Sequence, residues 1–456
     1  MNLQFDVAIV GGGLGGLAVA YHLSRQALAT RRPLRCAIIE PRTVLGQGIA
    51  YSSSNPAHLL NVPASKMSLS DASPDDFLKW LQSNKHPFQA ADFVPRYLYG
   101  NYLNSTLTRT LDETNGFFTL THLREKVQSI SRPNGQTFCL ECGNAQSLRA
   151  AQVVVALGND LTGTPAPAPL LSPWHAPSIE KASHTKRIAI LGTGLTAIDT
   201  VLALEEKNSK AQYTLISRRG LLPLPHAASL PDAPEVQKAL SEFLSIPSLG
   251  GKLRYFRANC QGFSEWRSLL DALRPHSHRI WSQLSHQEQL RFLRHLKPYW
   301  EVHRHRVPEQ SLEKIKQLTL TKRLRVMKAR VTFHADSIHP VKIYSSHTNQ
   351  EIGLFDCAFD CRGLWNSLPS HKNPVLQSLI DAKLARYDSL GLGIIPYKDH
   401  TGAVTGELSP HLFTLGSLRR GELWETTALR EIRQQAEVIS KTILQRTSAQ
   451  SEILAL

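Results

Sequence analysis

Three glycines near the amino terminus have the spacing that binds a dinucleotide. Gly11, Gly13 and Gly16 follow the apolar run Val7–Val10 in the order G-x-G-x-x-G. In such a turn the first glycine allows a sharp bend, the second lets the backbone approach a pyrophosphate, and the third lets a helix pack closely on the strand. The amino terminus of that helix then faces the phosphates. The residues therefore predict a strand, a glycine turn and a helix that bind a dinucleotide.

An acidic residue after the second apolar run indicates which dinucleotide this is. Glu40 ends the run Cys36–Glu40, and a carboxylate at this place accepts hydrogen bonds from both hydroxyls of an adenosine ribose. It would repel a ribose 2′-phosphate. We therefore expect FAD or NAD rather than NADP, and the position of the motif near the amino terminus favours FAD.

Residues 41–71 are predicted to form a loop that covers the nucleotide. Glycine and proline recur in this segment, which excludes a long regular element. Its small polar residues, together with leucines and Met67, suit a planar ring that is apolar on its faces and polar at its edge. An ordinary surface loop is the alternative.

Two helices are expected next. The first covers Asp75–Gln82, with Pro74 at its first position and Ser73 as its cap. The second covers Tyr97–Leu111 and directly follows Arg96. Arg96 could reach a phosphate or the edge of a flavin, although a surface ion pair is the commoner role of a single arginine.

The segments that follow have strand character. Thr119–Ile130 and Thr137–Leu140 are predicted to form a hairpin around the turn 133–135. Ala151–Gly158 is an apolar run that ends in glycine, as buried parallel strands do. Leu161–Ser183 is rich in proline and is predicted to be a linker.

A second dinucleotide-binding fold is predicted after the linker. Arg187–Leu191 is expected to be a strand. Gly192, Gly194 and Ala197 give the spacing G-x-G-x-x-A at the start of a helix that continues to about Lys207. The same strand, turn and helix therefore occur twice in one chain.

The residues after the next strand distinguish the second fold from the first. Gln212–Ile216 is followed by Ser217, Arg218 and Arg219 instead of an acid. Two guanidinium groups and a hydroxyl bind a ribose 2′-phosphate through charge-assisted hydrogen bonds. Since such bonds contribute roughly 1.5–3 kcal/mol each, we expect at least about tenfold preference for NADPH over NADH.

The remaining sequence is expected to be helical first and then to return to strands. Residues 234–322 have helical periodicity with many Arg and His residues. The run 303–306 alternates His and Arg, so its members point to different helix faces and a metal site is not favoured. Further strands are expected within 324–345, 354–360 and 412–416, and a final helix over 428–445.

This order places one nucleotide fold inside another. We predict an α/β protein of two nested Rossmann-like dinucleotide-binding domains, for FAD and NAD(P)H, with a helical insertion. The FAD-binding domain would be discontinuous and comprise residues 1–165 and 364–456. The NADPH-binding domain would comprise residues 184–363, with the insertion at about 234–322.

Composition and charge narrow the function classes. The 456 residues include 52 Lys and Arg against 37 Asp and Glu, so the net charge is +15, which suits anionic ligands. No nucleic-acid-binding motif accompanies this charge, so a basic enzyme is expected, with neither nucleic acid nor membrane as its partner. Six scattered cysteines suit neither a disulfide framework nor a zinc knuckle. Without a basic leader or a long apolar run, the expected location is the cytoplasm.

Several long strings resemble one flavoprotein family in their order along the chain. They are GGGLGG at 11–16, GQGIAYS at 46–52, HLLNVPASKMS at 58–68, FVPRYLYGNYL at 93–103, LGTGLTAID at 191–199, SRRGLLPLPH at 217–226, YWEVHRHR at 299–306 and LGSLRRGELWETTALREIRQQA at 415–436. The family comprises FAD/NAD(P)-binding flavoproteins that include FAD-dependent urate hydroxylase and the aspartate N-monooxygenase that forms nitrosuccinate. The resemblance implies tightly bound FAD and NAD(P)H-dependent oxygen chemistry.

The resemblance also implies which further residues line the flavin. They are His58, Asn61 and Met67 from the second loop string and Gly416, Trp424, Glu425 and Thr426 from the carboxy-terminal string. Arg362 stands where a small hydroxyl residue is expected in relatives, which could alter the contact between the domains. The substrate pocket does not match residue by residue, so neither urate nor aspartate is transferred as the substrate.

The functional hypothesis is a flavin monooxygenase of a small polar molecule, nitrogen-containing molecules included. NADPH would deliver a hydride to FAD, molecular oxygen would add to the reduced ring, and the resulting peroxide would oxygenate the substrate. The sequence assigns no catalytic acid or base and no oligomeric state. A disulfide reductase shares the nested architecture but needs a reactive dithiol, and the loop after Glu40 has no cysteine. A small-molecule reductase or dehydrogenase, and a non-catalytic nucleotide sensor, stay open.

Overall fold

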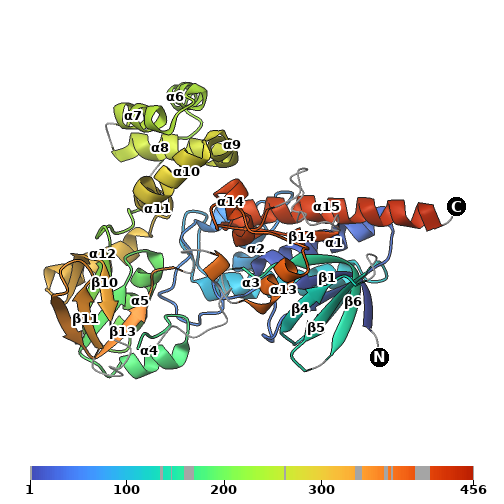
Figure 1. Ribbon diagram of the computed structural model, residues 1–456, viewed down its shortest axis with the longest axis horizontal. Coiled ribbons are helices and arrows are strands. Elements are labelled where there is room, and N and C mark those ends of the chain that lie inside the picture. The colour runs from blue at the N-terminus through green and yellow to red at the C-terminus, as the bar shows by residue number, and fades with distance from the viewer. Residues whose placement is uncertain are drawn as a thin grey trace. The chain divides into compact units, whose positions relative to one another are not determined.

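The computed structural model forms two compact units. It describes residues 3–133, 137–144, 146–158, 169–227, 229–260, 263–333, 341–363, 368–370, 373–395 and 411–454. The first unit comprises Met1–Ser54, Val62–Gly163 and Leu364–Leu456, and the second comprises Asn55–Asn61 and Thr164–Gly363. In Figure 1 the first unit therefore combines blue elements from the start of the chain with red elements from its end.

The first unit is built on a seven-stranded sheet. Its order is β3-β2-β1-β6-β5-β4, and β14 also pairs with β6. The strands are β1 (Leu3–Val10), β2 (Leu34–Ile39), β3 (Phe118–Leu123), β4 (Val127–Ser131), β5 (Phe138–Cys142), β6 (Ser147–Val155) and β14 (Leu412–Thr414). All pairs are parallel except those of β5 with β4 and β6. Val7, Ala8 and Ile9 are fully buried in β1, as expected for a parallel strand covered on both faces.

Helices from both ends of the chain cover this sheet. They are α1 (Leu14–Thr30), α2 (Asp76–Ser83), α3 (Arg96–Glu113), α13 (Pro374–Asp381), α14 (Arg420–Leu423) and α15 (Leu429–Leu454), with short 3₁₀ turns at Ala64–Lys66, Leu368–Ser370 and Gly416–Arg419. Figure 1 shows α15 beside α1. The Ser440 hydroxyl of α15 donates a hydrogen bond to the Val19 carbonyl of α1 at 3.3 Å. The carboxy-terminal helix is thus part of the first nucleotide fold.

The second unit contains a smaller parallel sheet and an antiparallel one. The parallel sheet has the order β13-β7-β8-β9 and the antiparallel sheet the order β10-β11-β12. The strands are β7 (Arg187–Leu191), β8 (Gln212–Ser217), β9 (Leu324–Lys328), β10 (Val331–Phe333), β11 (Val341–Ser345), β12 (Glu351–Phe355) and β13 (Cys357–Asp360). Helices α4 (Ala176–Ala182), α5 (Leu195–Glu205) and α12 (Glu309–Leu320) accompany them. Ile198 of α5 and Ile315 of α12 share one apolar cluster with Leu215 of β8.

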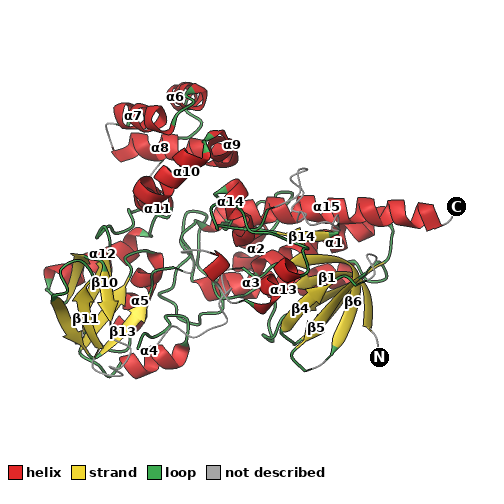
Figure 2. Cartoon of the chain, viewed as in Figure 1, coloured by secondary structure: helices red, strands yellow, loops and turns green. Residues whose placement is uncertain are grey.

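A separate group of helices follows β8, as the helical periodicity predicts. It consists of α6 (Pro234–Ser245), α7 (Leu249–Asn259), α8 (Phe263–Leu273), α9 (Ser277–Gln283), α10 (His286–Arg291) and α11 (Lys297–Arg304), with a π-helical turn at Phe292–Leu296. Figure 2 shows these helices in red. Leu240, Phe243 and Leu269 belong to an apolar cluster of their own.

The structure corrects the prediction of one long strand over Thr119–Ile130. Residues 118–123 form β3, which pairs in parallel with β2, whereas residues 127–131 form β4, which pairs with β5. These two strands stand at opposite ends of the strand order. The composition of this segment is uniformly that of a strand. It forms two strands because its two halves pair with different strands. The predicted turn residues Asn134 and Gly135 lie outside the described residues.

Two further predictions, of a helix cap and of an irregular linker, are also wrong. Ser73 does not cap α2, because Asp75 precedes that helix and makes no side-chain cap bond; the backbone carbonyl of Ser73 accepts the Asp76 N–H instead. The predicted linker is not wholly irregular, because Ala176–Ala182 forms α4 with Pro177 in its first turn. Proline is compatible with the first turn of a helix, so prolines do not mark this whole segment as irregular.

Candidate cofactor-binding sites

The first glycine turn has the tight geometry that its spacing predicts. Gly11 has a φ of +104°, and a Cβ there would lie 2.4 Å from the Ala156 carbonyl oxygen. A Cβ on Gly16 would lie 2.0 Å from the Gly11 carbonyl oxygen. Gly13 precedes α1 and has no side chain to cap it, so the first N–H groups of the helix can bind phosphate oxygens.

Two other segments of the first unit lie against this turn. The Gly46 N–H donates to the Gly12 carbonyl at 2.7 Å, and a Cβ on Gly13 would lie 3.5 Å from the Gly48 Cα. From the far end of the chain, Leu415 lies 3.5 Å from the place of a Cβ on Gly15. The turn, the loop after β2 and the segment after β14 therefore meet at the start of α1.

Glu40 has a structural role that its position alone does not reveal. Its side chain is buried, with an exposure of 8%. One carboxylate oxygen accepts the Gly12 N–H at 2.9 Å and the other accepts the Arg42 N–H at 3.1 Å. Glu40 thus fastens the glycine turn to the end of β2. Because each carboxylate oxygen can accept more than one hydrogen bond, ribose hydroxyls can still bind there.

Met67 and Arg96 also belong to the first unit. Met67 is buried, with an exposure of 3%, and follows the 3₁₀ turn in the loop region. Arg96 is the first residue of α3, after Pro95. Burial raises the pKa of the neighbouring Tyr51 hydroxyl to about 12, and the Arg96 charge opposes that rise. Arg96 therefore acts electrostatically on this part of the unit.

The carboxy-terminal segment has a strained turn at Trp424. Trp424 has a φ of +63° and a ψ of −62°, and the Glu425 N–H donates to the Leu423 carbonyl at 2.8 Å. This is a γ-turn with a left-handed central residue, which is rare and costs energy for a residue other than glycine. The turn directs the chain into Thr426 and on to α15.

Thr426 and Gly416 have the features that a bound cofactor would complete. Thr426 has an exposure of 1%, and its hydroxyl has no hydrogen-bond partner among the described residues. Gly416 has a φ of +69°, and nothing lies within 4 Å of the place of its Cβ. A buried polar group without a partner costs about 1–3 kcal/mol, so a ligand atom bound by Thr426 would recover that cost. These residues fit FAD.

His58 and Asn61 belong to the second unit, whereas the other predicted flavin residues belong to the first. His58 Nε2 donates to the Asp199 carbonyl at 3.0 Å. His226 Nε2 donates to the Asn61 carbonyl at 3.0 Å. Burial lowers the pKa of His226 to about 4, so its ring is neutral near pH 7 and donates through this nitrogen.

The second glycine turn repeats the geometry of the first with one difference. Gly192 has a φ of +125°, and a Cβ there would lie 2.3 Å from the Cys361 carbonyl oxygen. Gly194 precedes α5, and nothing lies within 4 Å of the place of its Cβ. Ala197, at the position of the third glycine, is fully buried. The helix can therefore tolerate one methyl group here that α1 cannot.

The turn after β8 presents two exposed guanidinium groups. The Ser217 hydroxyl accepts hydrogen bonds from the Gly220 N–H and from the Thr193 hydroxyl, both at 3.0 Å. Its own proton therefore remains for another acceptor. Arg218 and Arg219 are exposed between these anchored positions. A ribose 2′-phosphate could accept hydrogen bonds from all three side chains.

Sequence reasoning missed Thr193 and Lys328, which stand beside this turn. Lys328 ends β9 and is the strand partner of Ser217. A Cβ on Gly220 would lie 3.4 Å from the Lys328 Cβ. Arg219 lies 5.9 Å from the centre of the Tyr299 ring on α11. The sequence around Lys328 does not indicate its place beside the turn, because only the pairing of β8 with β9 brings it there.

The cysteines and the acidic residues form no further centre in the described part of the chain. All six cysteines are free thiols, and burial raises the pKa of Cys361 to about 12. The described residues contain no group of three or more His, Cys, Asp or Glu side chains that could hold a metal ion. Nor is any helix in the described segments long and apolar enough to cross a membrane.

Comparison with known proteins agrees with this arrangement. A family model described as FAD-NAD(P)-binding matches residues 8–160, which contain the first glycine turn and Glu40. The chain has the fold of FAD/NAD(P)-binding flavoproteins. The search of curated proteins gave no match.

Solved structures with this flavoprotein fold include oxygenases and reductases. The reduced form of ornithine hydroxylase from Pseudomonas aeruginosa is 15% identical, with a TM-score of 0.62, over 97% of this chain and 99% of that one. The ornithine N-hydroxylase of Kutzneria sp. 744, in a structure with reduced FAD, NADP⁺ and L-ornithine, is 14% identical, with a TM-score of 0.60, over 97% and 100%. Bacillithiol disulfide reductase from Staphylococcus aureus is 12% identical, with a TM-score of 0.55, over 97% and 99%. These identities establish the shared fold.

Proposed function

We propose that this protein is an FAD-dependent, NADPH-consuming monooxygenase of a small amine. The observation that carries the proposal is a chemical difference between two nucleotide folds in one chain. Glu40 stands after the second strand of the first fold, and Ser217-Arg218-Arg219 stands at the same place in the second. A carboxylate suits the unphosphorylated ribose of FAD, and the arginines suit the 2′-phosphate of NADPH.

In the first unit, the proposal gives several predicted residues a task toward FAD. The start of α1 binds the pyrophosphate, and Glu40 binds the ribose while it holds the turn through the Gly12 N–H. Thr426 offers a buried hydroxyl to the ring system. Bound FAD would accept a hydride and activate O₂. Met67, Arg96, Gly416, Trp424 and Glu425 of this unit, and His58 and Asn61 of the second unit, stay proposed flavin residues.

In the second unit, the tasks are to bind and orient NADPH. The start of α5 binds the pyrophosphate, with Gly194 leaving room for its approach. Ser217, Arg218 and Arg219 bind the 2′-phosphate. The bonds of Ser217 to Gly220 and Thr193 hold this turn in one conformation before the ligand arrives, which reduces the entropy that binding must overcome.

Two of the solved structures that share this fold support an amine substrate. The two ornithine hydroxylases share the fold over 97% of this chain. Of the two substrates named for the resembling family, aspartate has a primary amino group and urate does not, and the substrate pocket matches neither enzyme residue by residue. We therefore propose a small molecule with a primary amino group.

Isotope labelling tests the proposed reaction. The FAD-loaded protein is mixed with NADPH, ¹⁸O₂ and a panel of ornithine, lysine, cadaverine, aspartate and urate, and the products are analysed by mass spectrometry. We expect one amine to gain one ¹⁸O atom for each NADPH consumed. Oxidation of NADPH that yields only hydrogen peroxide with every substrate would count against the monooxygenase.

A small-molecule reductase is the second candidate, and the likeness to bacillithiol disulfide reductase favours it. Such an enzyme would consume NADPH under argon when given an organic acceptor, without any need for oxygen. A series of disulfides and quinones under argon tests this. Turnover with an acceptor, combined with no ¹⁸O incorporation in air, would replace the monooxygenase proposal by the reductase.

A further inference from the structure

A cavity of about 310 Å³ lies in the second unit, at the end of the sheet opposite its glycine turn. Arg187, at the start of β7, and residues at the start of β8 and β9 line it. The glycine turn follows the other end of β7, after Leu191. A five-residue strand spans about 13 Å between its first and last Cα atoms, so the cavity is separate from the dinucleotide site.

Four basic side chains and no acidic side chain are among the described residues that line this cavity. The basic residues are Arg187, Lys322, Arg323 and Arg325. Tyr213 and Phe355 contribute aromatic surface. A concave site with several cations and an apolar part can enclose a small anion.

The end of α12 brings two of these cations to the cavity. The Lys322 N–H donates to the Thr319 carbonyl at 3.0 Å, and the Arg323 N–H donates to the Leu318 carbonyl at 2.9 Å. These are the two bonds of a Schellman helix end, whose left-handed position usually holds glycine. Here Lys322 occupies it, with a φ of +59°. The chain therefore places a lysine where helix termination alone favours a residue without a side chain.

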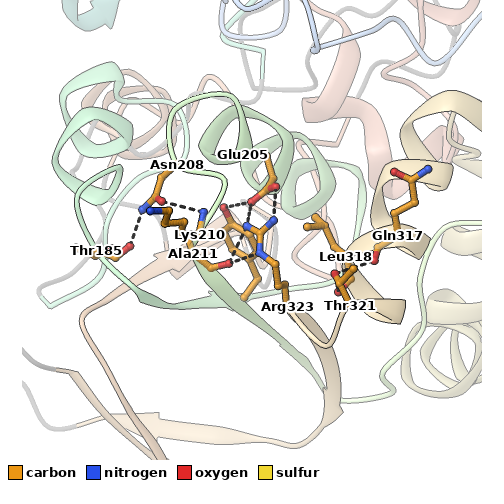
Figure 3. Close-up of polar contacts among 10 residues, drawn as sticks. Thr185, Glu205, Asn208, Lys210, Ala211, Gln317, Leu318, Thr321 and Arg323 are labelled. Carbon is orange, nitrogen blue, oxygen red and sulfur yellow. Dashed lines mark hydrogen bonds and ion pairs between the residues drawn. The ribbon is translucent and has the colours of Figure 1, made fainter.

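Arg323 is already neutralised and forms a fixed wall of the cavity. Figure 3 shows its guanidinium group against the Glu205 carboxylate and the Ala211 carbonyl. The Glu205 carboxylate accepts from Arg323 at 3.0 Å and from the Tyr213 hydroxyl at 2.8 Å. These bonds occupy the nitrogen atoms of Arg323. Its side chain therefore fixes the shape of the cavity wall and contributes little to the attraction of an anion.

The charges of the other three basic side chains are less well neutralised by nearby carboxylates. The Arg187 guanidinium lies 3.9 Å from Asp356, whose second carboxylate oxygen accepts two backbone N–H groups at 2.8 Å. Arg325 bonds the neutral hydroxyl of Thr214 through its Nε atom at 3.0 Å. Among the described residues, neither Arg325 nor Lys322 has an ion pair with a carboxylate. The cavity thus carries an excess of positive charge.

We propose that this cavity binds a small anion that bears phosphate groups. Lys322 and Arg325 are exposed and have no carboxylate partner among the described residues, and Arg187 has only a distant one, so their charges are available to a ligand with at least two negative charges. Guanidinium groups match phosphate oxygens in geometry, and a volume of about 310 Å³ suits a small molecule. This site is independent of the proposed reaction and of NADPH.

Calorimetric titration with inorganic pyrophosphate tests the proposal. The FAD-loaded full chain is titrated in the presence of saturating NADP⁺, so that the dinucleotide sites are filled. We expect binding to the parent protein, and a loss of affinity of about tenfold or more in the double variant Lys322→Asn, Arg325→Gln. Asparagine is chosen because it tolerates the left-handed backbone.

Lys383→Asn is the matched control, because Lys383 holds the same position at the end of α13. It has a φ of +54°, and its N–H donates to the Ile380 carbonyl at 3.0 Å. We expect this variant to bind pyrophosphate like the parent. The single variant Lys322→Asn is titrated as well, with circular dichroism to verify its fold, in case the double variant does not fold.

Three results would overturn the proposal. They are no binding of pyrophosphate to the parent when NADP⁺ is saturating, unchanged affinity in folded Lys322→Asn and double variants, and an equal loss in Lys383→Asn. Tighter binding of a hexaglutamate peptide than of pyrophosphate, lost in the same variants, would overturn the small-molecule assignment in favour of an acidic protein segment.

Discussion

The two glycine turns have the same first glycine for the same reason and differ where their nucleotides differ. A Cβ on Gly11 would clash with the carbonyl oxygen of Ala156, which directly follows β6. A Cβ on Gly192 would clash with the carbonyl oxygen of Cys361, which directly follows β13. In both cases the adjacent parallel strand leaves no room for a Cβ. The first glycine is therefore demanded by the sheet itself, whatever nucleotide is bound.

The differences lie in the third position of the turn and in the residue after the second strand. A Cβ on Gly16 would clash with the Gly11 carbonyl oxygen of the same turn, whereas the methyl group of Ala197 is accommodated and buried. Glu40 anchors one turn by accepting N–H groups with a charged carboxylate, whereas Ser217 anchors the other by a neutral hydroxyl. Both residues hold their turn in place, but the carboxylate of Glu40 would repel a ribose 2′-phosphate, whereas the hydroxyl of Ser217 could bind one.

The largest effect is expected from exchanging the third residues. In Gly16→Ala the new methyl group would lie about 2.0 Å from a carbonyl oxygen, so the first turn must open. We expect protein without FAD, or no folded protein, measured as the ratio of flavin to protein absorbance after purification. Ala197→Gly is the counterpart and should cost only about 0.5–1 kcal/mol. Equal FAD content in Gly16→Ala and the parent would contradict the prediction.

Ser217→Glu makes the second fold resemble the first. The carboxylate would stand beside the 2′-phosphate, so the ratio of kcat/KM for NADPH to that for NADH should fall by about 100-fold. Steady-state kinetics with both cofactors measures this ratio. Ser217→Ala is the control for loss of the hydroxyl alone and should lower the ratio far less. An unchanged ratio in Ser217→Glu would show that the 2′-phosphate binds elsewhere.

A buried histidine should make the first unit sensitive to acid. His22 stands nine residues after Gly13 in α1, where α5 has Ala203 nine residues after Gly194. Burial lowers the pKa of His22 to about 4, so the unfolded chain takes up a proton before the folded one as the pH falls. Stability present above about pH 6.5 is thus lost between there and about pH 4, and the loss at about pH 5.5 is about 1.4 kcal/mol.

Replacement of His22 by leucine tests this difference between α1 and α5. Urea unfolding, followed by flavin fluorescence, is measured for the parent and for His22→Leu at about pH 7.5 and about pH 5.5. The midpoint should fall less on acidification in the variant. A fall of the same size in both proteins would mean that other buried groups, such as His226, determine the acid sensitivity.

The smallest effect is expected at Lys328, which only strand pairing brings to the second turn. Lys328→Met keeps the aliphatic stem and removes one exposed charge, so the preference for NADPH should fall about threefold. Arg218→Ala should lower it about tenfold. Both are measured as ratios of kcat/KM. A larger loss in Lys328→Met than in Arg218→Ala would exchange their ranks as 2′-phosphate ligands.

The sequence by itself determined the two strand–glycine–helix units and the chemistry after their second strands. Gly11 and Gly192 have positive φ angles, a backbone conformation that favours glycine, so these positions of the motif can be recognised in the sequence. Glu40 directly follows β2, and Ser217 is the last residue of β8, so their positions in the two folds could also be predicted from the sequence. Local sequence is informative here because the motif is itself local.

The tertiary structure decided which distant segments meet. It divided 118–131 between the two ends of the strand order, assigned His58 to the second unit, and set Lys328 beside Ser217. It also buried the Thr426 hydroxyl and brought together the cations that line the cavity in the second unit. These features follow from strand pairing and packing between residues far apart in the chain, and no single stretch of sequence contains both partners.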